Sequence, residues 1–241
     1  MIAAPSPPVF GLALRSLLGG RRALALALFN LIPVIAVVAG LVGEASNAPL
    51  YGRVVGNLVI PVQIALVALA LAGAAISDER EDGTILYLTQ TPLPRMAIVG
   101  AKLLAIWAST VLLTLPGALA GAVVAADQGG DAVLVTLAAT ILASLAYSGL
   151  FTWLALRLKR AVITGLLYIV IWEGTIASFA DSADRFSVAA YARRLAQEAQ
   201  PEFAWETAAP TGVGVAVLAL LLFAAGGLWF GSRRLDRMEL P

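Results

Sequence analysis

Long runs of apolar residues, separated by shorter polar stretches, are the dominant pattern along the chain. A bilayer core about 30 Å thick is crossed by roughly 20 apolar helical residues, and six segments reach that length. Five of them contain a charge-free run long enough to cross, and the remaining one is interrupted by Glu173. Because the runs are continuously apolar rather than alternating with period two, they predict helices and not barrel strands. The predicted spans are approximately residues 23–43, 54–77, 99–126, 132–156, 161–180 and 208–231.

The composition agrees with a membrane location. Of 241 residues, 60% are hydrophobic and only 13% are charged, whereas a soluble domain carries about 25% charged residues. A water-soluble fold of this size would have too little polar surface to cover its core. We therefore predict an all-α, polytopic membrane protein, with one transmembrane domain over residues 1–241.

The positions of the basic residues predict the orientation. If the N-terminus is cytoplasmic, 12 of the 16 Lys and Arg residues lie in inner segments, and the four outside are Arg53, Arg185, Arg193 and Arg194. Inner loops are enriched in Lys and Arg. We therefore expect both termini on the cytoplasmic side of the cell (inner or plasma) membrane. The N-terminus does not resemble a cleaved signal peptide.

Several classes of chemistry are disfavoured by what the sequence lacks. It contains no cysteine and no histidine, which removes disulfides, thiol catalysis, Cys/His zinc sites and histidine acid–base chemistry. No broad basic field suggests a nucleic-acid partner. The P-loop pattern GxxxxGK followed by Ser or Thr is absent, so the chain does not itself bind ATP by that motif. We expect no catalytic site, no metal site and no cofactor in this chain.

The inner segment after the second span, residues 77–95, contains the start and stop signals of a short helix. Asp82 or Thr84 is suited to cap a new helix, and Pro92 ends it. About two turns remain, with Ile85 and Leu88 on one face. Two turns are not stable alone in water, so this helix must pack on its own bundle or on a partner protein. The alternative is a solvated loop with a short interfacial helix.

Here the sequence resembles the ABC-2 type permeases, the membrane subunits of one class of ATP-binding-cassette exporters. Their common pattern in this loop is Glu-Arg-Glu-x-Gly-Thr, followed by Leu, Thr-Pro and a basic residue. The matching residues in this chain are Asp78, Glu79, Glu81, Gly83, Thr84, Leu88, Thr91, Pro92 and Arg95, with Lys102 opening the third span.

The resemblance implies several features that the residues alone do not. Gly83 to Thr91 would form a coupling helix that docks on a separate ATPase subunit, which would bind ATP and Mg²⁺. A second permease copy, identical or related, would complete the path, since six helices are half of the usual assembly. An N-terminal interfacial helix and short outer helices between spans five and six are also implied. From the residues alone, Phe10 to Gly20 could equally begin the first span.

Glu173 is the one charged residue within the fifth predicted span. A charge near the bilayer centre costs about 2.5–3.5 kcal/mol on insertion scales, so such residues usually face the bundle interior or water. Three interpretations stay open: a structural Glu hydrogen-bonded to a tyrosine or threonine, a group of the substrate cavity, and a proton-coupling site. Farther along, Phe186, Tyr191 and Leu195 predict a helix at the outer interface; the alternative is a solvated loop with an anchor.

The favoured function is therefore a permease subunit that forms the translocation path of an ABC exporter for an unidentified substrate. One alternative is an ion-coupled secondary transporter using Glu173, which requires inverted repeats and broken helices near the midplane that the sequence does not reveal. An intramembrane enzyme would need paired carboxylates or other catalytic groups that the spans lack. A membrane scaffold without transport activity is the remaining alternative.

Overall fold

The structure, a computed structural model, describes residues 7–43, 46–77, 94–126, 129–176, 186–200 and 208–236. Across these ranges every regular element is a helix, which confirms the all-α prediction. The elements are α1 (Pro7–Leu18), α2 (Gly20–Phe29), α3 (Ile32–Val42), α4 (Asn47–Tyr51), η1 (Gly52–Ile64), α5 (Ala65–Ala72), η2 (Gly73–Ser77), α8 (Arg95–Ala125), α9 (Gly130–Arg157), α10 (Ala161–Leu167), η4 (Tyr168–Ile176), α12 (Val188–Ala196), η6 (Gln197–Ala199) and α13 (Val213–Asp236).

Five stretches are long and apolar enough to cross a membrane: Gly20–Val42, Pro49–Ile76, Arg95–Ala125, Gly130–Arg157 and Val213–Arg234. They correspond to the first, second, third, fourth and sixth predicted spans. The fifth prediction, 161–180, coincides with a shorter apolar helix, Ala161–Thr175, and its last residues lie outside the described ranges. The count of six spans therefore stays a prediction.

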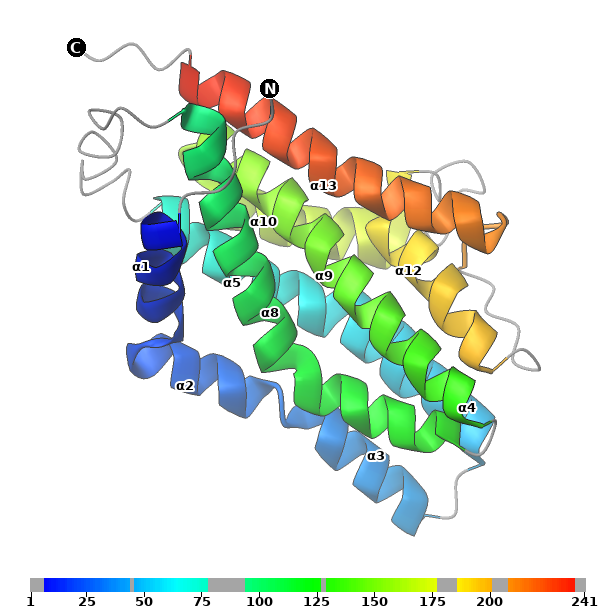
Figure 1. The fold of residues 1–241 in the computed structure, drawn as a ribbon. Helices are drawn as coiled ribbons and strands as arrows, with labels where there is room; N and C mark the ends of the chain where they lie inside the picture. The colour runs from blue at the N-terminus through cyan, green and yellow to red at the C-terminus, as the bar shows by residue number, and fades with distance from the viewer. Residues whose placement is uncertain are drawn as a thin grey trace.

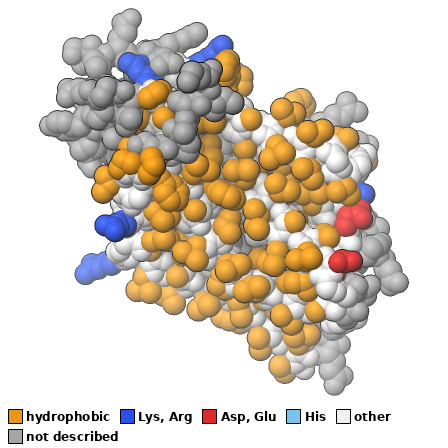
Figure 2. Space-filling model, viewed as in Figure 1, with side chains coloured by type: hydrophobic (Ala, Val, Ile, Leu, Met, Phe, Trp, Pro, Cys, Tyr) orange, Lys and Arg blue, Asp and Glu red, His pale blue; other side chains and the backbone are white. Residues whose placement is uncertain are grey.

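The helices form one inclined bundle, with α2 and α3 along one edge and α13 along the opposite edge (Figure 1). The face seen in Figure 2 is mostly hydrophobic. On that face, basic side chains gather mainly at one end and acidic ones at the other. An apolar band between polar ends is the surface that a bilayer requires.

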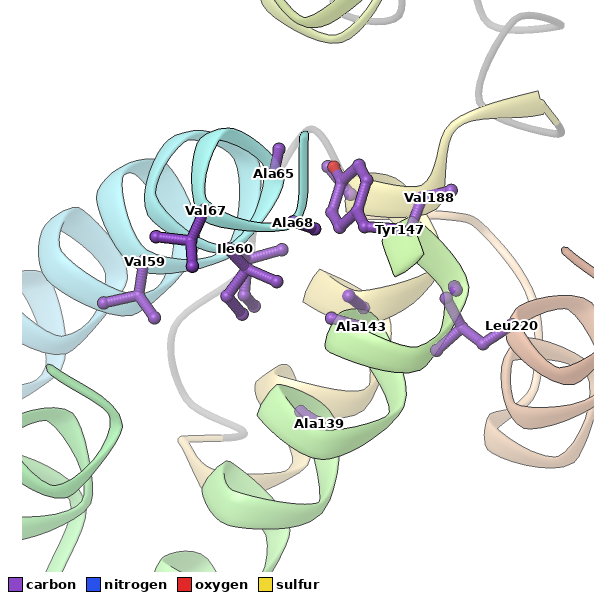
Figure 3. Packing of buried hydrophobic residues seen from close by; sticks show 14 of the residues in the cluster. Val59, Ile60, Ala65, Val67, Ala68, Ala139, Ala143, Tyr147, Val188 and Leu220 are labelled. Atoms are coloured by element: carbon purple, nitrogen blue, oxygen red, sulfur yellow. The ribbon is translucent and has the colours of Figure 1, made fainter. Parts of the chain in front are cut away.

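The second span, made of α4, η1, α5 and η2, is the centre of the bundle. Figure 3 shows Ile60 and Ala68 of this span on the side that faces α9, where Ala143 and Tyr147 lie. All four side chains are fully buried. Alanine is frequent at this contact, and small side chains let helix backbones approach closely. Bundle cohesion in lipid then comes from close packing rather than from the hydrophobic effect.

The first span is not continuous. The helix α2 ends at Phe29, and α3 begins at Ile32 with Pro33 close to its start. Proline lacks the backbone N–H that would continue the hydrogen-bond ladder, so it is tolerated at the start of a helix and breaks its interior. Before this span, α1 is a separate helix, set off by Gly20 at φ 84°. Residues 7–18 therefore do not extend the first span.

Candidate functional site

Glu173 lies on η4 and is buried, with 3% of its surface exposed. Its carboxylate accepts four hydrogen bonds. The Tyr168 hydroxyl donates at 2.8 Å, and the Ser187 hydroxyl donates to the other oxygen. The backbone N–H groups of Val188 and Ala189 donate at 3.0 and 3.4 Å. A buried carboxylate with this many donors keeps its hydrogen-bonding capacity satisfied without water.

The sequence near Ser187 explains why these donors converge. Ser187 is the N-cap of α12, and its hydroxyl accepts a hydrogen bond from Ala190 N at 3.0 Å. The first N–H groups of a helix have no partner within the helix, and they carry a partial positive charge. Glu173 therefore receives its compensating charge from the start of α12. Of the three interpretations of Glu173, this geometry agrees with the structural one, and the tyrosine partner is Tyr168.

The helix α12 is held inside the bundle by polar contacts along its length. Arg193 Nε donates to the carbonyl of Gly56 at 2.8 Å, and the Tyr51 hydroxyl donates to the carbonyl of Ala196 at 3.1 Å. The same Tyr51 hydroxyl is 2.8 Å from Thr136 Oγ1, near the beginning of α9. The first residues of α12 contact Glu173, and the helix runs from there through the interior to the end of the bundle where α9 begins.

This position differs from the sequence expectation. We expected Tyr191 and Leu195 to anchor a helix at the outer interface, yet both are buried, and only Phe186 just before the helix is exposed. The helix packs against η1, α9 and α13. The expectation overlooked small residues such as Ala189 and Ala192, which let a nine-residue helix fit between longer ones.

A second polar contact joins the first and second spans. Gln63 Nε2 donates to both oxygens of Asn30, the residue at which the first span breaks. The third span meets this point through Gly117, where an added Cβ would lie 2.7 Å from Gln63 Oε1 and 3.2 Å from Pro33. Sequence analysis missed this contact. Its only sign was a pair of amide side chains within otherwise apolar runs.

The residues predicted to couple to an ATPase lie mostly outside the described ranges, from Asp78 to Pro92. Arg95, the last of them, is the first residue of α8. The described residues on either side of the segment are tied together: Lys102 Nζ on α8 donates to the Ala75 carbonyl on η2 at 2.7 Å. Lys102 is only 5% exposed. A buried lysine is stable when paired, and here the end of the second span supplies its partner.

The family described as ABC-2 family transporter protein matches residues 27–179, more than half of the chain. The chain belongs to this family. No curated protein matches the chain.

As a member of the ABC-2 transporter family, the protein is a membrane-embedded transport permease, as the sequence around residues 78–95 predicted. The family match includes the segment 78–93, Lys102 and Glu173, and it ends before α12 and α13. Members of this family generally work with an ABC ATPase subunit. Among the described residues, no group of three or more Asp, Glu, His or Cys side chains could hold a metal ion.

Proposed function

We propose that this ABC-2 permease forms the translocation path of an ATP-binding-cassette exporter and is driven by a separate ATPase subunit. The chain itself performs no catalysis, and ATP and Mg²⁺ bind to the partner. The residues Gly83 to Thr91 dock on that partner from the cytoplasmic side, where both termini also lie. Family membership supports the transport role, and the distribution of Lys and Arg supports the orientation.

The single structural observation in favour of coupling is the Lys102–Ala75 hydrogen bond. It joins the end of η2 to the beginning of α8, on either side of the segment that would dock. The second span is also the most buried of the candidate spans. A displacement applied to the docking segment would therefore reach two helices at once. Closure of two ATPases would shift the bundle between two arrangements in this way.

A second copy of the chain, or a related permease, would complete the path. Only 17% of the most apolar stretch of the first span is buried within one chain. Its exposed side chains include Leu28, Ile35 and Val38. An exposed apolar face of this extent packs either against lipid or against another membrane helix. The second copy would cover part of it.

The proposal is tested by co-purifying the permease with its ATPase and measuring ATP hydrolysis in lipid nanodiscs. Leu88→Asp and Gly83→Pro should weaken the complex by about 30-fold, as expected for the loss of a central docking contact. Arg160→Gln is the matched control, because Arg160 is exposed at another predicted cytoplasmic turn. Full binding and full ATP hydrolysis with both docking variants would contradict the proposal, as would labelling of residues 83–91 from outside the cell.

An ion-coupled secondary transporter is the alternative to be tested. The broken first span and the start of α12 inside the bundle are features that such transporters also use. In that case the purified chain would move cargo without an ATPase, and Glu173→Gln would abolish transport while leaving the fold intact. Under the ABC proposal, the chain alone transports nothing.

A further inference from the structure

The helices α9 and α13 cross with their backbones in direct contact. A Cβ added to Gly227 would lie 2.1 Å from the Gly149 carbonyl oxygen, and one added to Gly149 would lie 2.6 Å from the Cα of Ala224. Any larger side chain at Gly149 or Gly227 would push the helices apart. This contact fixes α13 on α9 through small residues, as is common between membrane helices.

Beside this crossing is an apolar groove of about 450 Å³. Its walls include Leu150 and Trp153 of α9 and Phe223 and Phe230 of α13. Gly226 also lines the groove, and a Cβ added there would meet no atom within 4 Å. Unlike its neighbour Gly227, Gly226 therefore has no helix contact that explains its small size, and the space beside it is open.

The groove continues into a basic pocket. A second hollow of about 240 Å³ shares Trp153 and Phe230 with the groove and is otherwise lined by Arg157, Arg233 and Arg234. None of these lining residues is acidic. The Arg157 guanidinium lies 5.7 Å from the centre of the Trp153 ring. Three guanidinium groups thus surround one end of an apolar groove.

Arg233 is positioned in a similar way. Its guanidinium lies 4.4 Å from the centre of the Trp229 ring. Stacking on an indole ring orients a guanidinium while leaving its N–H donors available to an anion. Arg157 and Arg233 are therefore held in a geometry suited to phosphate oxygens.

We propose that this site binds one anionic phospholipid, with an acyl chain in the groove beside Gly226 and the phosphate among Arg157, Arg233 and Arg234. Arginine binds phosphate through paired N–H donors. The apolar groove alone would accept any acyl chain, so selectivity for an anionic headgroup comes from the arginines. A protein partner would have to supply both an apolar side chain for the groove and carboxylates for the pocket, whereas one phospholipid carries both parts in that order. This site does not depend on coupling to an ATPase.

Tryptophan fluorescence gives a direct test, because Trp153 and Trp229 lie next to the arginines. The full chain is reconstituted in phosphatidylcholine vesicles that contain small amounts of brominated phosphatidylglycerol or brominated phosphatidylcholine, since bromine quenches nearby indoles. We expect brominated phosphatidylglycerol to reach half-maximal quenching at a concentration at least about tenfold lower. Equal quenching by both lipids in the wild-type protein would overturn the proposal.

A triple variant tests the basic pocket, which is one half of the site. The triple variant Arg157→Gln, Arg233→Gln and Arg234→Gln should remove the preference for the anionic lipid. The matched control, Lys159→Gln with Arg160→Gln, removes two charges from exposed residues that do not line the pocket. The control should keep the preference. A preference that survives in the triple variant, or that falls equally in the control, contradicts the site.

Gly226→Leu places a side chain in the groove without forcing α13 away from α9, because a Cβ at this position meets no atom within 4 Å. We expect it to lower quenching by brominated phosphatidylglycerol several-fold while the unfolding temperature stays unchanged. This variant keeps the test valid even if the triple arginine variant does not fold. Unchanged quenching in Gly226→Leu would show that no acyl chain lies in the groove. Complete displacement of the lipid by soluble glycerol phosphate would show an anion site without lipid, which also overturns the proposal.

Discussion

The first and second spans have nearly the same mean hydropathy but opposite surroundings. In the first span, 17% of the most apolar stretch is buried, whereas 78% is buried in the second. Hydropathy reports that a helix prefers lipid to water, and it does not distinguish lipid from the interior of a helix bundle. The sequence of a membrane protein therefore predicts where its spans lie more readily than whether each span faces lipid or other helices.

The difference follows from side-chain size and from specific polar contacts. The second span contains Ala65, Ala68 and Ala72, which are fully buried and let other helices approach. A Cβ added to Gly165 of α10 would lie 2.3 Å from the Leu69 side chain, so α10 packs directly on this span. The first span instead turns bulky residues such as Leu28 outward.

The largest expected effect comes from truncating matched isoleucines in the two spans. Ile60 is fully buried in the second span, and Ile35 is 64% exposed in the first. Ile60→Ala leaves a cavity and should lower the free energy of unfolding by about 3 kcal/mol. Ile35→Ala should cost less than about 0.5 kcal/mol. Thermal unfolding of the monomer in a mild detergent measures both, and similar costs there would contradict the difference in burial between the two spans.

A smaller effect is expected at the hydrogen bond that joins the two spans. Gln63→Met removes both hydrogen bonds from Gln63 Nε2 to residue 30, and Asn30→Leu removes the one to Asn30 Oδ1 while keeping the backbone carbonyl. Each should destabilise the protein by about 1.5 kcal/mol. In the double variant the two costs should not add, which leaves a coupling energy of about 1 kcal/mol. Additive costs in the double-mutant cycle would mean that the spans are held together elsewhere.

Tyr51→Phe tests how the second span holds α12. The substitution removes hydrogen bonds to the Ala196 carbonyl and to Thr136, and it should cost about 1 kcal/mol. Thr136→Val is the control, because the bond between Tyr51 and Ala196 survives it. The control should be less destabilising, because the Tyr51 hydroxyl keeps its bond to Ala196. The other bond that is lost, from Thr136 Oγ1 to the Ala132 carbonyl, is only a back-bond to a carbonyl within α9. A larger loss for Thr136→Val would contradict this order.

The smallest change in stability is expected for single cysteine substitutions at exposed positions. The natural chain contains no cysteine, so each introduced thiol is a unique label. Ile35→Cys and Leu222→Cys both replace exposed residues, on α3 and α13 respectively. If a second copy covers the first span, oxidation should cross-link Ile35→Cys into a dimer on denaturing gels. The α13 variant should stay monomeric. The reverse result would place the partner on α13.

The sequence predicted the long spans well because continuous apolar runs leave few alternatives to a membrane helix. It predicted that Glu173 faces the interior or water and offered a tyrosine as one partner, but it did not predict the partners at the start of α12. Ser187 and Val188 are 14 and 15 residues further along the chain, and only the fold brings them to η4. The burial of α12 was equally hidden, since a nine-residue helix has no hydropathy signal of its own.

The break at Asn30 and Leu31 has a mechanical consequence. To bend an intact membrane helix, backbone hydrogen bonds must be broken where no water replaces them. In the first span this loss is already built in, because α2 and α3 are separate helices and Pro33 has no N–H to contribute. Tilting one half against the other therefore disrupts fewer backbone hydrogen bonds than bending a continuous helix would. The first span is consequently a place where this bundle can change its curvature at low cost.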